Sequence, residues 1–493
     1  MNKTKIEYEP VIGLEVHVQL NTNSKMFCKC SIAPFESEPN TYVCNICMGY
    51  PGTLPLINNK AIEMVVKSGL ALNGNINQMT RFDRKNYHYP DLMKGYQISQ
   101  FKYPIVVGGE VIVNTGKEKT INLNRIHLEE DTAKLTHINN GNEKPKSLID
   151  INRSGTPLME VVSEPEISNA EEARKFLLEL HSIFTEIGVT KGNLEQGHFR
   201  CDANISIRPK GSTKLGEKVE VKNMNSFRSV VRAINFEIER QTKEIILDNK
   251  ILQETRGWNE SKGETVSQRS KESAHDYRYF PDPDLPNIYL DDDLLKQIRK
   301  SIPELKKDRI EFLINHHSLN EQVIGILSAD LNLFNYFKDI HKKTKTKQFD
   351  ISDQDLANWI TEELLKILEL NKLTTKDISN VFNLAFILDL INLTNGKTIN
   401  RNASREILAK MINSSKSPNQ LIEELGLSNI SDIDQLTDLC TQAISNNPDA
   451  VKDYKSGKDT AIKFLLGQVM KLSRGKADPN QTEINLEKIL KNE

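Results

Sequence analysis

Hydrophobic and polar residues alternate along three short segments in the first half of the chain, which predicts β-strands with one buried face. In residues 12–20 every second residue is aliphatic, and the positions between them hold Gly13, Glu15, His17 and Gln19. Residues 200–208 and 218–222 alternate in the same way, with polar positions at Asp202, Asn204, Ser206, Glu220 and Lys222. If these segments are neighbours in one sheet, their polar positions share one face.

The residue types on this predicted face favour a binding site. Most half-buried sheets carry ordinary solvated charges on their outer face, which is the alternative interpretation. His17, Asp202 and Asn204, however, are short or bifunctional groups that suit convergence on a ligand. Carboxylates, amides, a histidine and a lysine together are the groups that hold Mg²⁺ and nucleotide phosphates. The sequence therefore predicts an enzyme site.

Two long helices are predicted within this strand-rich half, which Gly and Pro turns punctuate up to about residue 286. The first begins with Ser168 and Glu171 as a capping box, carries a helical apolar stripe and ends at Gly188. The second is expected from Ser226 to about Leu247.

From about residue 294 the pattern is helical only, with helices expected over 353–370, 375–393, 401–412, 421–425, 432–444 and 460–472. The lysine-rich run 342–347 suggests an exposed linker. These patterns predict an α+β protein. An antiparallel-sheet-rich domain with inserted helices (1–293) is followed by an all-α helical domain (294–415) and a small α-helical tail (416–493).

Composition narrows the class of protein. With 493 residues, of which 38% are hydrophobic and 27% charged, the chain is expected to form two to four domains. Its net charge of −2 gives no global basic field, so contact with nucleic acid would need local patches. The start of the chain lacks the apolar core of a signal peptide, and no apolar run is long enough to span a bilayer. We expect a soluble protein without a membrane partner, in the cytoplasm or, in a eukaryote, in an organellar matrix.

Cysteine spacing predicts a metal site in a loop, residues 28–47, that follows the first strand. Cys28 and Cys30 form a C-x-C pair, and Cys44 and Cys47 form a C-x-x-C pair. In a reducing compartment two such pairs indicate a structural site with four thiolates around Zn²⁺. Unbound or redox-active thiols are the alternative, because C-x-C is the less usual spacing.

Several common motifs are absent from the sequence: the phosphate-binding G-x-x-x-x-G-K-[ST], the dinucleotide-binding G-x-G-x-x-G after a strand, H-E-x-x-H and G-x-S-x-G. If the chain uses ATP, it does so on a less common scaffold.

A series of longer blocks resembles the GatB family, one of the subunits of the tRNA-dependent amidotransferases. In order, the blocks are VIGLEVHVQL, FDRKNYHYPDLMKGYQISQF, IHLEED, NRSGTPLMEVVSEP, RCDANISIRP, KNMNSF and DYRYFPDPDLP. They cover the strand-rich half, and DYKSGKDTAIKFLLGQVMKLSRGKADP resembles the family's YqeY-like tail domain. The resemblance implies that the strand-rich half is the family's cradle domain, with the kinase and transamidase site, and that the helical and tail domains bind tRNA.

The resemblance also implies a reaction and partners. ATP phosphorylates the side-chain carboxylate of Glu-tRNA(Gln) or Asp-tRNA(Asn), and ammonia then displaces the phosphate to give the amide. Of the implied partner subunits A and C, the first is a glutaminase that supplies the ammonia, and the second is small and helps to hold the complex together. The implied co-substrate and metals are ATP, Mg²⁺ and a structural Zn²⁺ that some relatives lack. The choice between the two misacylated tRNAs stays open.

By resemblance, the magnesium-site positions are Glu15, His17, Glu130 and Glu220. Glu129 is the adjacent candidate, because strand alternation places it, rather than Glu130, beside His127. Asp202 and Asn204 are assigned as metal or substrate ligands, and Lys222 as a phosphate contact. Tyr87 and Tyr89 are candidates for packing a nucleotide or the 3′ end of tRNA, with ordinary turn packing as the alternative.

Two other functions remain open at this point. One is a non-catalytic, tRNA-binding assembly subunit, and the other is an ATP-dependent ligase or kinase for a free amino acid. The tail favours contact with RNA, because Lys458, Lys463, Lys471 and Arg474 flank or lie on an amphipathic helix that follows a turn at Gly457 and Asp459.

Overall fold

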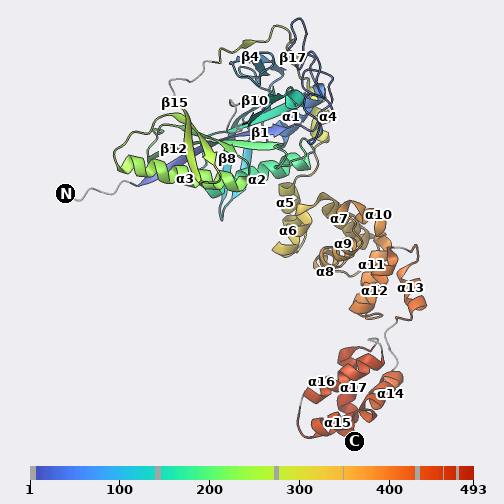
Figure 1. Ribbon diagram of the computed structural model, residues 1–493. Coiled ribbons are helices and arrows are strands. Elements are labelled where there is room, and N and C mark those ends of the chain that lie inside the picture. Colours follow the sequence, from blue (N-terminus) through green and yellow to red (C-terminus); the bar gives the residue numbers. More distant parts are fainter. Residues whose placement is uncertain are drawn as a thin grey trace, which may run out of the picture. The chain divides into compact units, whose positions relative to one another are not determined.

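The computed structural model describes residues 7–138, 146–270, 277–347, 349–412, 414–427, 433–458, 460–473 and 477–492. The chain divides into two compact units, Met1–Pro303 and Glu304–Glu493 (Figure 1). The first contains the sheets and the second contains helices, as the α+β prediction required.

A ten-stranded sheet forms the centre of the first unit. Its order is β15 (Glu264–Ser270), β14 (Glu254–Asn259), β13 (Val219–Met224), β12 (Phe199–Pro209), β1 (Tyr8–Gln19), β11 (Pro157–Ser163), β8 (Glu118–Glu130), β6 (Val106–Val107) and β2 (Asn75–Ile76), with β7 (Glu110–Asn114) also paired to β8. Among these described strands only β13 and β14 pair in parallel. The three predicted strands are confirmed as neighbours, because β1, β12 and β13 are adjacent.

Helices cover the apolar face of this sheet. Leu14, Val16, Ala203 and Ile205 are at most 1% exposed. Phe199, on the same face of β12 as Ala203, makes ring contacts with α2 (Ala170–Glu186) and α3 (Phe227–Ile246). The two helices pack side by side (Figure 1). The opposite face of β1, β12 and β13 is therefore left for the polar side chains.

The beginning of α2 differs by one residue from the prediction. The cap is Asn169, whose side chain accepts a hydrogen bond of 2.8 Å from the Glu172 backbone N–H, while Glu172 accepts from the Ser168 N–H. The predicted Ser168–Glu171 box is therefore wrong, since Glu171 instead pairs with Arg174. Helix α3 begins after its cap Ser226, as predicted.

Smaller elements complete the first unit: β3 (Met79–Thr80), β4 (Asp83–Asn86), β5 (Tyr96–Ser99), β9 (Lys134–Ile138), β10 (Lys146–Asp150), β16 (Phe280–Pro281), β17 (Ile288–Tyr289), α1 (Asn59–Ala71) and α4 (Asp292–Lys300). A 3₁₀ turn, Ile151–Arg153, follows β10. The predicted domain limit between residues 293 and 294 falls inside α4, which packs on α1.

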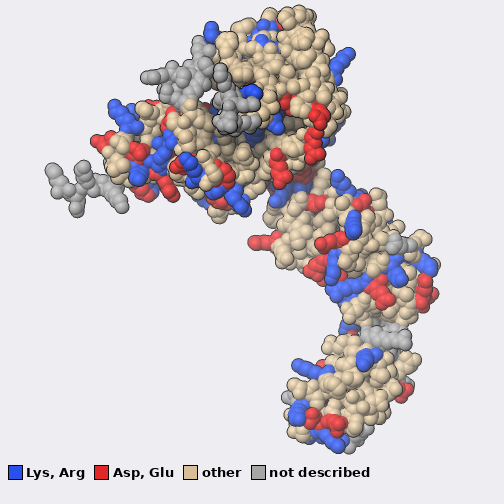
Figure 2. Space-filling model, viewed as in Figure 1, with Lys and Arg blue, Asp and Glu red and all other residues tan. Residues whose placement is uncertain are grey.

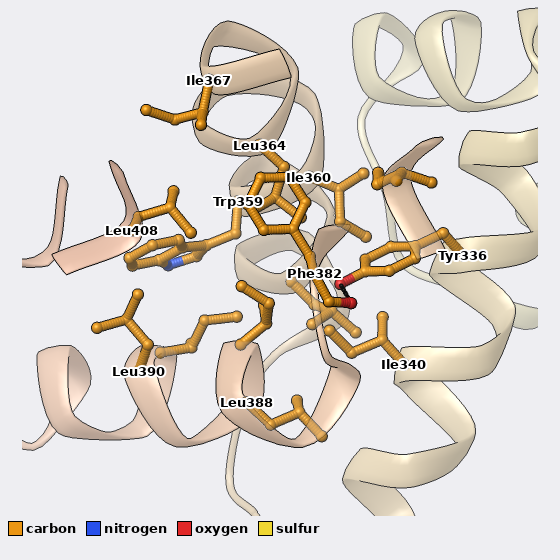
Figure 3. Packing of buried hydrophobic residues seen from close by; sticks show 14 of the residues in the cluster. Tyr336, Ile340, Trp359, Ile360, Leu364, Ile367, Phe382, Leu388, Leu390 and Leu408 are labelled. Atoms are coloured by element: carbon orange, nitrogen blue, oxygen red, sulfur yellow. Dashed lines mark hydrogen bonds between the residues drawn. The ribbon is translucent and has the colours of Figure 1, made fainter. Parts of the chain in front are cut away.

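The second unit contains two hydrophobic cores. The first is built by α5 (Lys306–His316), α6 (Glu321–Ala329), α7 (Leu331–Lys347), α8 (Asp353–Asn358), a π-helical turn (Trp359–Leu364), α9 (Leu365–Leu370), a 3₁₀ turn (Thr375–Asp377), α10 (Ile378–Val381), α11 (Leu384–Asn395), α12 (Arg401–Met411) and α13 (Pro418–Leu425). Trp359, Tyr336 and Phe382 are packed together in it, and the Tyr336 hydroxyl donates to the Phe382 carbonyl at 3.3 Å (Figure 3).

Two sequence interpretations of this core are corrected. The lysine-rich run is not a linker but the end of α7, because Ile340 and Thr344 bury one face of that helix. The single helix expected over 375–393 is interrupted after Phe382, where Asn383 caps α11. Helix α13, which the sequence assigned to the tail, places Leu421 and Ile422 in this first core.

The second core joins α14 (Ile433–Ser445), α15 (Pro448–Lys455), α16 (Thr460–Leu472) and α17 (Pro479–Asn492). The predicted apolar stripe of α16 is confirmed by the burial of Ile462, Leu465 and Val469. Lys463 and Lys471 are exposed, and Lys458 pairs with Asp453 at 2.8 Å. Asp459 and Arg474 lie outside the described residues.

Charges of both signs are interspersed over the visible surface of both units (Figure 2). This agrees with the small net charge of the chain. Among the described helices none is long and apolar enough to cross a membrane.

Candidate active site

The polar positions of β1, β12 and β13 meet as predicted. Glu15 lies opposite Asp202, and Asn204 lies opposite Glu220. The Asn204 amide donates to Glu15 Oε1 at 2.8 Å. Together with the side chains that β8 and β11 add, these residues form the polar face: Glu15, His17, His127, Glu129, Glu160, Asp202, Asn204, Glu220 and Lys222.

A lysine links the carboxylates on one side of the polar face. Lys222 Nζ lies 3.2 Å from Asp202 Oδ2 and 3.2 Å from Glu220 Oε1. Burial alone would raise the pKa of Glu220, but the Lys222 charge and a hydrogen bond from Thr255 lower it below its usual value. Glu220 is therefore held as an anion.

Histidines and glutamates alternate on the other side of the polar face. Glu160 Oε2 lies 3.2 Å from His127 Nε2 and 3.5 Å from His17 Nε2, and His17 Nε2 is 3.7 Å from Glu129 Oε1. Burial lowers the pKa of His17, but the hydrogen bond to Glu160 and the nearby acids outweigh it and raise the pKa to about 9. His17, Glu129 and Glu160 are also close enough together to share one metal ion.

The two adjacent glutamates of β8 point to different partners. Glu129 faces His17 on the polar face, as strand alternation suggested. Glu130 lies on the other side of the strand, where it pairs with Lys94 and accepts a 3.0 Å hydrogen bond from the Ile98 backbone N–H. The geometry therefore joins Glu129, and not Glu130, to the other candidate ligands. Which of the two binds metal stays a prediction.

Aromatic side chains and a lysine lie close to the acids of the polar face. Lys85 Nζ is 5.0 Å from the ring centre of Tyr277 and 5.9 Å from that of Tyr87. Burial would lower the pKa of Lys85, but the charges of Glu129 and Glu160 raise it. Tyr87 is thus placed beside the site, whereas Tyr89 is exposed. Their role in packing a nucleotide or a tRNA end remains a prediction.

The four cysteines of the 28–47 loop come together. Their sulfur atoms all lie within 4.8 Å of one another, and Cys44 Sγ and Cys47 Sγ are 4.0 Å apart. Tetrahedral zinc with sulfur ligands at about 2.3 Å needs sulfurs about 3.8 Å apart, so the set fits that ion. Hydrogen bonds from Cys28 and the Cys44 N–H, with the charge of Lys25, lower the pKa of Cys47 to about 4. A thiolate is thus favoured there.

This cysteine cluster packs against the turn that follows β10. Lys25, which is fully buried, reaches both Cys47 Sγ (3.6 Å) and the Ile151 carbonyl (3.3 Å). The same turn carries Arg153, which lies 3.4 Å from Asp131 at the end of β8. The cysteine loop therefore supports structure next to the polar face and has no free coordination position for chemistry.

A cavity of about 660 Å³ opens where β1 ends, beginning at Gln19 on the same face as His17. Lys134, Arg153 and Lys191 line it together with Phe35 and Ile32 from the cysteine loop. Cations beside apolar groups suit a ligand that carries phosphate and a base or ribose.

The donor set of the polar face fits Mg²⁺. Its carboxylate and amide oxygens are the ligands that this ion prefers. Oδ1 of Asn204 is buried, and no described residue donates a hydrogen bond to it, so this oxygen is available to a cation.

The sequence of the chain also matches known proteins. The family model described as the GatB/GatE catalytic domain matches residues 10–296, and the model described as the GatB domain matches residues 335–490. The chain belongs to the GatB family. The polar face and the cysteine cluster both lie within the catalytic-domain match of this family.

Similar GatB-family proteins occur in several bacteria. Those of Dehalococcoides mccartyi (strain CBDB1), Thermodesulfovibrio yellowstonii and Brevibacillus brevis are 47%, 44% and 42% identical to this chain. The matches cover 96%, 99% and 98% of this chain and 97%, 100% and 99% of the relatives. Each is named as part of an aspartyl/glutamyl-tRNA(Asn/Gln) amidotransferase, of which it is the subunit designated B. The resemblance found in the sequence is confirmed.

Sequence reasoning missed two members of this neighbourhood, Glu160 and Lys85. Glu160 is the one charged residue in the otherwise apolar strand PLMEVVS, and an acid in such a strand could have indicated a buried partner. Lys85 comes from a short strand of another sheet, and its approach to the acids has no signal in the local pattern.

Proposed function

We propose that this chain is the kinase and transamidase subunit of a tRNA-dependent amidotransferase, acting on Glu-tRNA(Gln), Asp-tRNA(Asn) or both. The observation that carries the proposal is the polar face, where carboxylates, an amide, a histidine and a lysine converge from five strands of one sheet. The names of the relatives support the substrate class. The family's enzymes use ATP and work as multi-subunit complexes.

The proposed reaction has two steps. A side-chain carboxylate oxygen of the misacylated tRNA attacks the γ-phosphorus of ATP, and ADP leaves. The nitrogen of ammonia then attacks the resulting acyl phosphate at its carbonyl carbon, phosphate leaves, and the nitrogen loses a proton to give the amide. Both steps bring anions together, so they need fixed positive groups and amide donors.

The residues of the polar face meet these needs. Glu15, Glu220 and either Glu129 or Glu130, with His17, would hold Mg²⁺, and Asp202 and Asn204 would bind metal or substrate. When bound, Mg²⁺ bridges phosphate oxygens and neutralises their charge. Lys222 would contact a phosphate oxygen, since its ammonium lies between two acids at the rim of the site. The cavity beside Gln19 is large enough for a nucleotide.

The other parts of the chain would serve assembly and tRNA binding. We propose that Zn²⁺ occupies the Cys28, Cys30, Cys44 and Cys47 cluster in a structural role. Partner subunits A and C would complete a cytoplasmic complex, in which the glutaminase of the pair supplies the ammonia. The helical core and the tail would bind the tRNA.

The alternative of a non-catalytic assembly subunit is not favoured, because a scaffold does not need five clustered carboxylates beside His17 and Lys222. The test is ATP hydrolysis by the complex reconstituted with both partner subunits. We expect hydrolysis to depend on a misacylated tRNA and to be absent with correctly acylated tRNA or free glutamate. Equal hydrolysis with free glutamate would overturn the proposal. Comparison of Glu-tRNA(Gln) with Asp-tRNA(Asn) would identify the substrate.

A further inference from the structure

A cluster of metal-ligating side chains lies in the helical unit, outside the site described above. Its members are His317 at the end of α5, His341 on α7 and Asp353, the first residue of α8. We propose that these three residues form a second transition-metal site, which takes Zn²⁺ or a similar divalent ion with a water molecule as fourth ligand. Amidation chemistry does not require this site.

The three side chains present their ligand atoms to one point. His317 Nδ1 lies 2.7 Å from Asp353 Oδ2, and His341 Nε2 lies 3.1 Å from Asp353 Oδ1. The three ligand atoms all fall within 4.8 Å of one another. Tetrahedral ligands about 2.1 Å from zinc are about 3.4 Å apart, so each pair has to open by less than about 1 Å to admit the ion.

The two imidazole rings are held in place by aromatic neighbours. His317 packs edge-on against Phe337, with ring centres 5.0 Å apart, and also contacts Phe312 at 5.5 Å. His341 stacks on the same Phe337 at 6.0 Å, and the two histidine rings are 4.5 Å apart. Rings fixed in this way lose little freedom on binding an ion, which favours a preformed site.

The donor chemistry selects the class of ion. Two imidazole nitrogens and one carboxylate are a donor set for Zn²⁺ and related first-row metals, whereas Mg²⁺ and Ca²⁺ prefer oxygen ligands. His317 is nearly buried, but the side chains of His341 and Asp353 are 17% and 25% exposed, so an ion and a water molecule can enter from solvent. The nearby charge of Lys345 opposes a cation and is offset by the Asp353 carboxylate.

Binding at this site would join three helices that the chain connects through separate loops. The end of α5, the middle of α7 and the start of α8 would be held by one ion, so the helical core should resist unfolding more strongly with metal than without it. The competing explanation is that Asp353 only accepts hydrogen bonds from both histidines, which requires no ion.

Cobalt(II) distinguishes this site from the cysteine cluster in the full-length protein. After removal of metal by a chelator, Co²⁺ at thiolates gives an intense sulfur-to-metal charge-transfer absorption, whereas Co²⁺ at nitrogen and oxygen gives only weak visible bands. We expect a chain with Cys44→Ser and Cys47→Ser to retain one equivalent of Co²⁺ without the charge-transfer band. Adding His341→Gln should abolish that equivalent.

A matched control is His316→Gln, which alters the neighbouring exposed histidine on α5. It should bind metal as the parent does, and Zn²⁺ should raise the thermal unfolding midpoint of the parent and of this control but not of His341→Gln. Asp353→Asn provides a second test should His341→Gln fail to fold. Equal metal content in the parent and in both site variants, or no metal in the parent beyond the cysteine cluster, would overturn the proposal.

Discussion

On the polar face, each carboxylate whose pKa is shifted is lowered by a specific neighbour. Glu160 is buried between His127 and His17, and these histidines hold its pKa well below the usual value although burial acts in the opposite direction. Glu220 is held as an anion by Lys222 and Thr255. The face thus concentrates negative charge in a fixed arrangement before any cation binds, which favours tight, oriented binding of a divalent ion.

The neighbouring glutamates of β8 can be separated by experiment. Glu129→Gln removes a charge from the polar face and should reduce amidation by at least ~100-fold with little change in the thermal unfolding midpoint. Glu130→Gln leaves the Lys94 ammonium without its partner and should lower the free energy of unfolding by about 3 kcal/mol. Normal amidation by Glu129→Gln, with unchanged stability of Glu130→Gln, would contradict this division. Glu171→Gln on the surface of α2 is the control.

Much of the site could be predicted from single residues. Alternation alone identified Glu15, His17, Asp202, Asn204, Glu220 and Lys222 as sharing one face, because side chains on a strand have a period of two. It could not identify Lys85, which reaches the acids from a different sheet, since such a contact depends on tertiary packing.

At the scale of elements, helix α3 is joined to the edge of the sheet by one buried glutamate. Glu237 is fully buried and accepts hydrogen bonds from Arg240 (2.8 Å), Gln241 (3.0 Å) and Thr265, and Arg256 lies 3.2 Å away. Burial would raise the pKa of Glu237, but these donors lower it below the usual value. The ionised carboxylate therefore stabilises the packing of α3 on β14 and β15.

This pKa shift predicts a pH dependence of stability. Because the pKa of Glu237 is lower in the folded state than the value of about 4.3 in the unfolded state, its contribution is present above that pH. It is lost as pH falls through the folded-state pKa. Glu237→Gln should lower the free energy of unfolding by about 2 kcal/mol at pH 7 and flatten its decline in acid. Denaturant unfolding at several pH values, with exposed Glu239→Gln as control, measures this; parallel pH profiles would refute it.

The cysteine loop makes a second prediction at this scale. The thiolate cluster should bind one equivalent of zinc, which the Cys44→Ser and Cys47→Ser double variant should lose. Since the loop packs on the turn at Ile151, the variant should unfold at a lower temperature before its chemistry fails. Metal analysis and thermal unfolding test this, with exposed Ser37→Ala in the same loop as control. A complete absence of thiolate-bound zinc from the intact protein would discard the idea.

Element positions were predicted where local signals were strong, as for the cap Ser226 and the strands of the polar face. The lysine-rich run was misread because charge alone does not show that Ile340 and Thr344 bury the opposite face of α7. Likewise, the sequence did not show that Leu421 and Ile422 pack in the first helical core, because that depends on neighbours distant along the chain.

At the scale of the whole molecule, the chain combines a catalytic sheet with helices that form two separate cores. The tail core contains α14 to α17 and leaves Lys463 and Lys471 exposed. An independent core with exposed lysines suits a module that grips the phosphates of tRNA.

Deleting residues 433–493 should therefore weaken binding of aminoacyl-tRNA much more than it affects use of ATP or ammonia. The lost affinity should be its salt-sensitive part, with roughly one unit of log–log slope per phosphate contact removed. Filter binding at several salt concentrations measures both quantities, and Lys463→Gln with Lys471→Gln isolates the charge effect in the full-length chain. Unchanged affinity and slope would show that these lysines only solubilise a packing helix.

The most direct test of the whole account is the activity of polar-face variants in the complex reconstituted with the glutaminase and the small partner subunit. Glu15→Gln and Glu220→Gln each remove a charged ligand of the proposed phosphoryl-transfer site. ATP-dependent amidation of the misacylated tRNA should fall by at least ~100-fold in each, while glutaminase activity persists and Glu171→Gln behaves as the parent. Near-normal amidation by both variants would contradict the assignment of the active site to this face.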